Sequence, residues 1–160
     1  MIRKCDGTDT PKIFEIVNEA AVAYEGVIAA DCYHQPYMSR EELEREMTRV
    51  TFFGFVENGD LVGVMGIEPV QDVTLIRHAY VLPRFQGSGI GRRLLEHLKK
   101  LTRTPRLLVG TWAAADRAIS FYRKNGFVLL PDKDRLLQRY WDIPPRQVET
   151  SVVMGIELAG

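Results

Sequence analysis

One glycine-rich stretch constrains the fold of this chain more than any other: it runs from Arg84 to Arg92 and reads RFQGSGIGR. An apolar run over 73–82 precedes it and an amphipathic run over 90–101 follows it, so we predict a strand, a tight turn and a helix. The first N–H groups of a helix lack internal partners, and the helix dipole is positive there. Glycine also lets the backbone approach a ligand closely. The stretch therefore predicts either a plain turn or a phosphate site at the start of the helix.

Two common nucleotide-binding motifs do not fit this stretch. A dinucleotide fingerprint needs a third glycine where the chain has Arg92, and a P-loop needs Lys and Ser or Thr after its last glycine, where Gly91 is followed by two arginines. The pattern that does match is Gln/Arg-x-x-Gly-x-Gly/Ala, from Gln86 to Gly91. A phosphate site here is therefore of a different kind from either motif.

Composition limits the classes of protein that the chain can belong to. Its 160 residues suit one domain over 1–160, and 21 basic residues balance 21 acidic ones. A nucleic-acid-binding protein usually has a basic excess, so we expect no nucleic acid partner. No apolar run is long enough to span a membrane, and the first residues lack an apolar signal region. Cys5 and Cys32 form neither a metal-binding spacing nor a disulfide framework, so we expect a cytoplasmic protein with reduced thiols and no metal.

Hydrophobic periodicity predicts an alternation of strands and helices. We expect a short strand over 2–5, helices over 11–24 and 40–49, strands over 50–56, 61–67 and 73–82, a helix over 90–101, a strand over 106–112, a helix over 116–124, and strands over 127–130 and 148–158. Asn58-Gly59 is a strong hairpin signal, so the three strands before the glycine stretch form an antiparallel meander. The strand over 106–112 follows a helix and should pair in parallel. The chain is therefore expected to be an α+β domain with a mixed, mostly antiparallel sheet flanked by helices, and a loop over 131–147.

A second block supports a family assignment. Ala118 to Phe127 reads AISFYRKNGF and looks like an Ala-x-x-x-Tyr-x-x-x-Gly-Phe pattern at the end of a helix. Together with the hexad from Gln86 to Gly91, in this order and with a strand before each block, the chain resembles the GCN5-related N-acetyltransferases, the GNAT superfamily. The resemblance extends along nearly the whole element order.

The resemblance implies acetyl-CoA as cosubstrate. It implies that the strands over 73–82 and 106–112 splay apart to admit it. The backbone of Ala79, Tyr80 and Val81 would then contact the acetyl end and the pantetheine arm. The pyrophosphate would lie on a loop formed by Gln86, Gly87, Ser88, Gly89, Ile90 and Gly91. Tyr122 would protonate the departing thiolate, although an aromatic residue at this helix position also suits the core.

The base that must deprotonate an acceptor amine is not evident. Family members with a glutamate on the strand over 106–112 would carry it at position 110, where this chain has Gly110. Members that use the preceding strand would carry an acid or histidine at Leu75 or Arg77. Glu68, near the end of the third strand, is the best carboxylate in the region. We therefore take Glu68 as the candidate base, with water-mediated deprotonation as the alternative.

Two further residues bear on the site. His78 has a suitable pKa, but strict alternation along a strand puts it on the face opposite Arg77 and Ala79, so we expect a structural histidine. Ala115 stands where many family members have an asparagine, which removes one expected CoA contact. These departures leave the phosphate loop untouched.

The acceptor site is expected in the irregular segments over 26–38 and 131–147, with the helix that begins at Arg40. Aromatic side chains lie in these segments: Tyr33, His34, Tyr37, Tyr140 and Trp141. Glu25, Asp31 and Glu68 are acids that could hold a cationic amine, so we favour a small or amino-acid-like primary amine. We therefore predict an N-acetyltransferase that moves an acetyl group from acetyl-CoA to such an amine. Two alternative functions stay open: a noncatalytic acyl-CoA-binding regulatory module and an unrelated phosphate- or nucleotide-binding domain. The oligomeric state also stays open, with a homodimer as one option.

Overall fold

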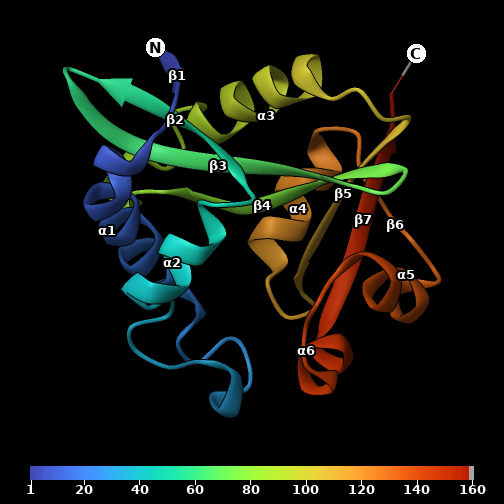
Figure 1. Cartoon of the computed structure of the whole chain (residues 1–160). Coiled ribbons are helices and arrows are strands. Elements are labelled where there is room, and N and C mark those ends of the chain that lie inside the picture. The colour runs from blue at the N-terminus through green and yellow to red at the C-terminus, as the bar shows by residue number, and fades with distance from the viewer. Residues whose placement is uncertain (159–160) are drawn as a thin grey trace.

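The computed structural model describes residues 1–158 and contains a seven-stranded sheet flanked by helices (Figure 1). Its elements in chain order are β1 (Ile2–Lys4), α1 (Thr10–Ala21), α2 (Arg40–Glu46), β2 (Thr51–Glu57), β3 (Asp60–Val70), β4 (Val73–Val81), α3 (Ile90–Leu101), β5 (Arg106–Trp112), α4 (Asp116–Lys124), β6 (Val128–Leu129), α5 (Lys133–Tyr140), α6 (Pro145–Thr150) and β7 (Ser151–Glu157). The strands lie in the order β1-β2-β3-β4-β5-β7-β6, and every pair is antiparallel except β4 with β5. The expected mixed α+β fold is therefore confirmed.

The β2–β3 hairpin turns at the predicted dipeptide. Asn58 and Gly59 both have positive φ, 51° and 82°, as a two-residue turn that matches the twist of its strands requires. The hairpin sets the register of the meander, so that β3 and then β4 follow in antiparallel order.

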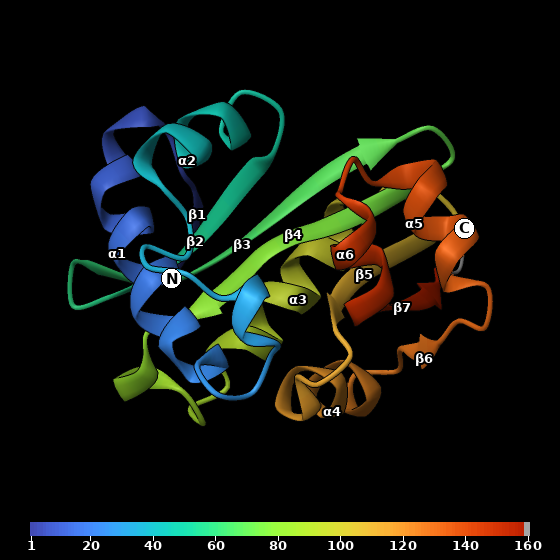
Figure 2. The same cartoon turned by 90° about the horizontal axis from the view of Figure 1, so that it is seen from below.

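Strands β4 and β5 pair over only part of their length. The parallel register runs from Val73 opposite Arg106 to Ile76 opposite Val109. Beyond these pairs β4 continues to Val81 and β5 to Trp112 without bonding to each other. In Figure 2 the helix α3 is visible between the diverging ends of the two strands. The sheet is therefore open at this point, as the resemblance implied.

A β-bulge interrupts β4 just past the last paired residues. Val64 lies opposite Tyr80 and Gly66 opposite Arg77, so two residues of β4 face one of β3. His78, the first of the two, has φ +58°, in the left-handed region. The bulge breaks the alternation of side chains, and both Arg77 and His78 reach the same carboxylate, that of Glu46. The prediction that His78 faces away from Arg77 is therefore wrong.

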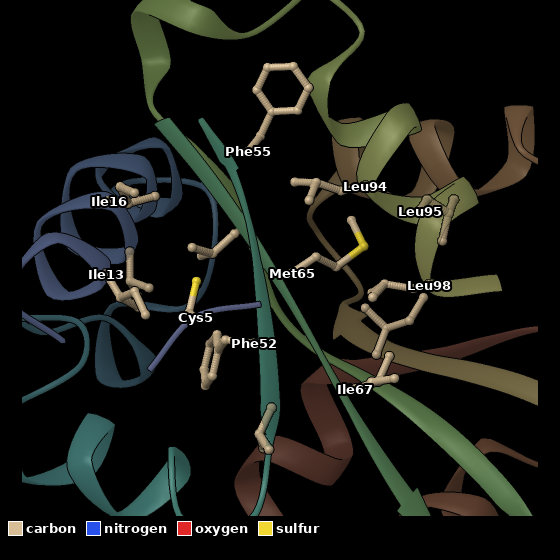
Figure 3. Packing of buried hydrophobic residues seen from close by; sticks show 14 of the residues in the cluster. Cys5, Ile13, Ile16, Phe52, Phe55, Met65, Ile67, Leu94, Leu95 and Leu98 are labelled. Atoms are coloured by element: carbon tan, nitrogen blue, oxygen red, sulfur yellow. The ribbon is translucent and has the colours of Figure 1, made fainter. Parts of the chain in front are cut away.

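Both faces of the sheet carry a hydrophobic layer. Figure 3 shows Ile13 and Ile16 of α1 packed on one side of β2 and β3, and Leu94 and Leu98 of α3 on the other. In Figure 2, α1, α2, α5 and α6 lie in front of the sheet and α3 behind it. Among residues 1–158 there is no helix whose length and hydropathy suit a membrane crossing.

The segment over 131–147 is not a loop but holds α5 and the start of α6, and the last strand begins at Ser151 rather than 148. Leu136, Leu137 and Tyr140 are buried at helical spacing and pack in a second cluster with residues of β4, β5 and β7. Pro145 occupies the first position of α6, where its missing N–H costs no hydrogen bond. The polar residues between these positions obscured both helices.

Candidate functional site

The first cavity is an open cleft of about 1190 Å³ at the divergent end of β4. It is lined by the end of α1, the last residues of β4, the glycine loop, and both α3 and α4. All but one of the expected cofactor-binding residues line it: Ala79, Tyr80, Val81, Gln86, Gly87, Gly89, Ile90 and Gly91. Ser88 is the exception, and its hydroxyl donates to the carbonyl oxygen of Phe85 at 2.5 Å. The residues expected to hold one ligand therefore share one cleft.

The glycine loop is shaped by its backbone. Gly87 and Gly89 have φ of 81° and 85°, a region that other residues adopt only with strain, and a Cβ at either would meet nothing within 4 Å. Gly89 precedes the first residue of α3, so the unpaired N–H groups of that helix open onto the cleft. Gly91 instead allows close packing between α3 and α4, because a Cβ there would lie 3.3 Å from the ring of Phe121. The loop therefore offers donors to an anion while α3 and α4 pack closely behind it.

The end of β4 presents backbone groups to the same cleft. The N–H of Leu82 donates to the carbonyl of Val62 at 2.9 Å, so Leu82 points toward β3. Because alternate residues of an antiparallel strand point their backbone groups to opposite edges, the N–H of Val81 points toward the gap left by β5. The carbonyl of Val81 accepts from the Gln86 side chain at 2.9 Å. The N–H of Val81 is therefore a backbone donor that faces the gap, and the hydrogen bond from Gln86 holds this residue in place.

Tyr122 projects from α4 into the first cavity. Its side chain packs against Phe121 and Phe127 and is only 4% exposed. Within residues 1–158 its hydroxyl has no hydrogen-bond partner, and no buried polar side-chain atom is left unpaired, so this oxygen opens onto the cleft. Burial, and then the nearby Tyr24, raise the pKa of Tyr122. The phenol is therefore protonated at neutral pH and able to donate.

The second cavity has a volume of about 590 Å³ and lies on the α2 and α6 side of β4 and β5. It is strongly charged, with three acids and three arginines in its wall: Glu42, Glu46, Asp142, Arg45, Arg49 and Arg77. Of the aromatic residues expected around an acceptor, His34, Tyr37 and Trp141 line it. Tyr33 and Tyr140 do not line it, and neither do Glu25, Asp31 or Glu68.

The two cavities share Tyr24 and Tyr80 in their walls. Tyr24 packs on Tyr37 with ring centroids 5.4 Å apart, and the hydroxyl of Tyr37 accepts from Trp112 Nε1 at 2.8 Å. Burial, and then Tyr24 and Tyr37, raise the pKa of Tyr80 far above its usual value. An uncharged cluster of tyrosines therefore lies where the two cavities meet.

A charged cluster lies in the wall of the second cavity. Glu46 Oε1 lies 2.6 Å from His78 Nε2 and 3.0 Å from Arg77 Nη2. Arg77 also donates to Glu68 at 3.0 Å, and Arg49 pairs with both carboxylates. Glu68 therefore sits behind Arg77, outside both cavities, while Glu46 and His78 face the second cavity. The sequence did not single out Glu46, because helix α2 meets β4 only through the fold.

The indole ring of Trp141 covers Gly110, the position at which some family members would carry a glutamate. A Cβ at position 110 would lie 3.3 to 3.5 Å from atoms of Trp141. Trp141 follows α5 and lines the second cavity beside Gly110. The ring therefore occupies the space that a larger side chain on β5 would need. Ala115, which replaces the expected asparagine, is buried in the wall of the first cavity.

Comparisons with known proteins bear on this arrangement. A family model described as an acetyltransferase (GNAT) domain matches residues 48–129, more than half of the chain. The PaiA N-acetyltransferase of Thermoplasma acidophilum, solved with coenzyme A, is similar with a TM-score of 0.76 and 19% identity, covering 98% of each chain. The ribosomal-protein-S18-alanine N-acetyltransferase of Escherichia coli is similar with a TM-score of 0.72 and 21% identity, covering 100% of this chain and 94% of its own.

A third similar structure is the N-acetylglutamate synthase of Neisseria gonorrhoeae, solved with coenzyme A and N-acetyl-glutamate. Its TM-score is 0.72 at 20% identity, and the match covers 100% of this chain and 35% of the synthase. A comparison with curated proteins finds no match. The structural neighbours support the fold, and the family model spans the glycine loop and the tyrosine block. The chain therefore belongs to the GNAT acetyltransferase family.

Proposed function

We propose that this protein transfers the acetyl group of acetyl-CoA to a primary amine that enters through the second cavity. The observation that carries the proposal is the meeting of two cavities at Tyr24 and Tyr80, one bordered by the glycine loop from Gln86 to Gly91 and the other strongly charged. Two molecules that react with each other need such a shared point. Coenzyme A in two of the structural neighbours supports the identity of the donor.

The residues of the first cavity fit acetyl-CoA. A Cβ at Gly87 or Gly89 would meet nothing within 4 Å, so the loop borders open space at the start of α3, which suits a pyrophosphate, and the exposed Arg92 adds a positive charge in the same wall. Acetyl-CoA supplies a thioester with an electrophilic carbonyl carbon and a thiolate leaving group. We assign the backbone of Ala79, Tyr80 and Val81 to the acetyl end and the pantetheine arm, with one of their N–H groups stabilising the negative charge that develops on the carbonyl oxygen.

Tyr122 is the proton donor in this proposal. A departing thiolate needs a proton, and a buried phenol with a raised pKa retains its own at neutral pH. The hydroxyl is open to the first cavity and has no competing partner within residues 1–158. Glu68 keeps a supporting role, because it holds the guanidinium of Arg77.

The charge pattern of the second cavity favours a small, amino-acid-like acceptor. Carboxylates there attract an ammonium group and arginines attract a carboxylate, so a zwitterion finds partners for both of its charges. The volume of about 590 Å³ suits a small molecule rather than a folded partner. Both features distinguish this cavity from the more apolar first one.

The test is a panel of amines, including free amino acids, polyamines and short peptides, incubated with acetyl-CoA and scored by release of free thiol. We expect turnover with at least one small amine and CoA binding by calorimetry. CoA binding without turnover across the panel would favour a noncatalytic acyl-CoA-binding module. Absence of CoA binding would overturn the proposal entirely.

A further inference from the structure

The proposed transfer needs a proton acceptor in the second cavity. An amine with a pKa of about 10.4 enters as an ammonium ion and has no lone pair until it loses a proton. The indole of Trp141 covers Gly110, and Glu68 lies behind Arg77 outside both cavities. The acceptor of this proton must therefore come from another element.

His78 lies in the wall of this cavity. It lies in β4 two residues past the last pair with β5, where the strands have parted, and it lines the second cavity beside Tyr80. Its Nε2 lies 2.6 Å from Oε1 of Glu46, and because an ionised carboxylate can only accept, we place the ring proton on Nε2. Within residues 1–158 no hydrogen bond engages its Nδ1. Stacking on Phe52, with centroids 5.8 Å apart, holds the ring plane, so a lone pair is held in a fixed direction.

The backbone at His78 supplies an independent argument. Its φ of +58° is the left-handed conformation that a bulge of this kind normally gives to glycine. A residue with a Cβ is strained there by roughly 1–2 kcal/mol, and such strain is concentrated at functional sites. The bulge also turns the ring toward Glu46, which a regular strand would prevent. A strained backbone therefore presents this particular side chain to the cavity.

We infer that His78 accepts the proton of the acceptor ammonium in the second cavity, and that Glu46 is the positioning residue that fixes its ring. This inference rests on the proposed function. The proton moves from the ammonium to Nδ1, and the freed lone pair forms the C–N bond while the C–S bond breaks. The thiolate takes the proton of Tyr122, which regains one from the new amide nitrogen. His78 then releases its proton to solvent, so one proton leaves per turnover.

The surroundings keep the imidazole neutral before the reaction. Burial lowers the pKa of His78, and the positive charges of Arg77 and Arg49 lower it further, while Glu46 opposes them. Glu68 faces Arg77 rather than the ring. A neutral ring at pH 7 is the form that accepts a proton, so the activity should fall on the acidic side as the ring becomes charged.

His78→Asn is the main test, because asparagine tolerates the left-handed backbone. We expect kcat to fall by about 10²- to 10⁴-fold, the range of general base catalysis, with CoA affinity unchanged. The acidic limb of the kcat/KM profile should disappear. His97→Asn is the control: His97 lies on α3 against Phe53, outside both cavities, and its loss should leave kcat and the limb unchanged.

Glu46→Gln separates positioning from a structural role. Loss of the carboxylate lowers the pKa of His78, so the acidic limb should move to lower pH, a shift that a merely structural role would not produce. If this variant does not fold, ¹⁵N-histidine NMR of the unaltered protein decides, with the His78 signal assigned by its loss in His78→Asn. We expect the proton on Nε2 and a titration midpoint equal to that of the limb. A proton on Nδ1 instead would overturn the inference.

The outcomes distinguish this inference from the function on which it rests. If the unaltered protein acetylates no amine, both fall. If it does acetylate an amine and His78→Asn keeps kcat within threefold with the acidic limb intact, only the inference falls.

Discussion

The hydroxyl of Tyr122 offers a direct test at the scale of a single residue. Tyr122→Phe removes one oxygen without a hydrogen-bond partner in residues 1–158, so the free energy of unfolding should change little. Thiol release should slow by about 10²-fold or more, because the thiolate loses its donor, with CoA affinity unchanged.

Tyr140→Phe is the matched control for that substitution. The Tyr140 hydroxyl donates to Asp72 at 2.6 Å, outside both cavities. Its loss should lower the free energy of unfolding by about 1 kcal/mol and leave kcat unchanged. Equal activity of Tyr122→Phe and the unaltered protein would contradict the proton-donor role.

Glu46 links the site to stability in acid. Burial alone would raise the pKa of Glu46, but His78, Arg49 and Arg77 outweigh it and lower the pKa from 4.5 to about 2. The carboxylate therefore stabilises the fold above pH 4.5, and this contribution is lost as the pH falls toward 2. Glu46→Gln should lower the free energy of unfolding by about 2–3 kcal/mol at pH 7 and by less at pH 3, measured by urea unfolding. The same deficit at both pH values would contradict this linkage.

Single residues differ in how well the sequence predicted their place. Tyr122 and the glycines of the loop are fixed by local blocks, so the sequence placed them in one cleft. Glu46 and His78 meet only because a bulge rotates β4 and because α2 packs beside it. A prediction from strict alternation assumes a regular strand, but the bulge adds one residue to β4. The orientation of His78 was therefore predicted wrongly.

At the scale of elements, the turn before α3 can be tested by substituting a glycine that has a positive φ. Gly89→Ala places a Cβ at φ +85°, which should cost roughly 1–2 kcal/mol of stability and displace the N–H groups at the start of α3. CoA affinity measured by calorimetry should fall by about tenfold or more, equal to about 1.4 kcal/mol.

Gly59→Ala provides the matched comparison. Gly59 has φ +82° in the β2–β3 turn, and a Cβ there also meets nothing within 4 Å. The variant should lose similar stability and keep full CoA affinity. If both variants bind CoA equally well, the loop does not hold the anion.

Elements with strong local signals were predicted almost to the residue, and others were not. Helices α3 and α4 and strand β5 begin and end where the sequence placed them. Helices α5 and α6 were missed, because their apolar positions are sparse and only contact with β4, β5 and β7 makes a core of them. Tertiary burial, rather than local pattern, determines those two helices.

At the scale of the whole molecule, the two cavities predict a kinetic order. Among residues 1–158 only Tyr24 and Tyr80 line both cavities, and neither carries a thiol or an amine to take up the acetyl group. For the proposed transfer we therefore expect both substrates to be bound at the same time. Initial-rate plots should intersect, and no free thiol should appear in a burst when the amine is omitted. Parallel plots or a burst would indicate an acetylated enzyme.

The charged wall of the second cavity has a consequence for how the cycle ends. In the proposed reaction the acceptor arrives with a positive charge that Glu42, Glu46 and Asp142 would attract, and acetylation would convert that group into a neutral amide. The acetylated product would therefore lack the electrostatic attraction that held the ammonium group. CoA, the second product, would keep the phosphate groups that bind the glycine loop. We expect the acetylated amine to be a weak product inhibitor and free CoA to be a strong one. Release of CoA would then be the rate-limiting step of turnover.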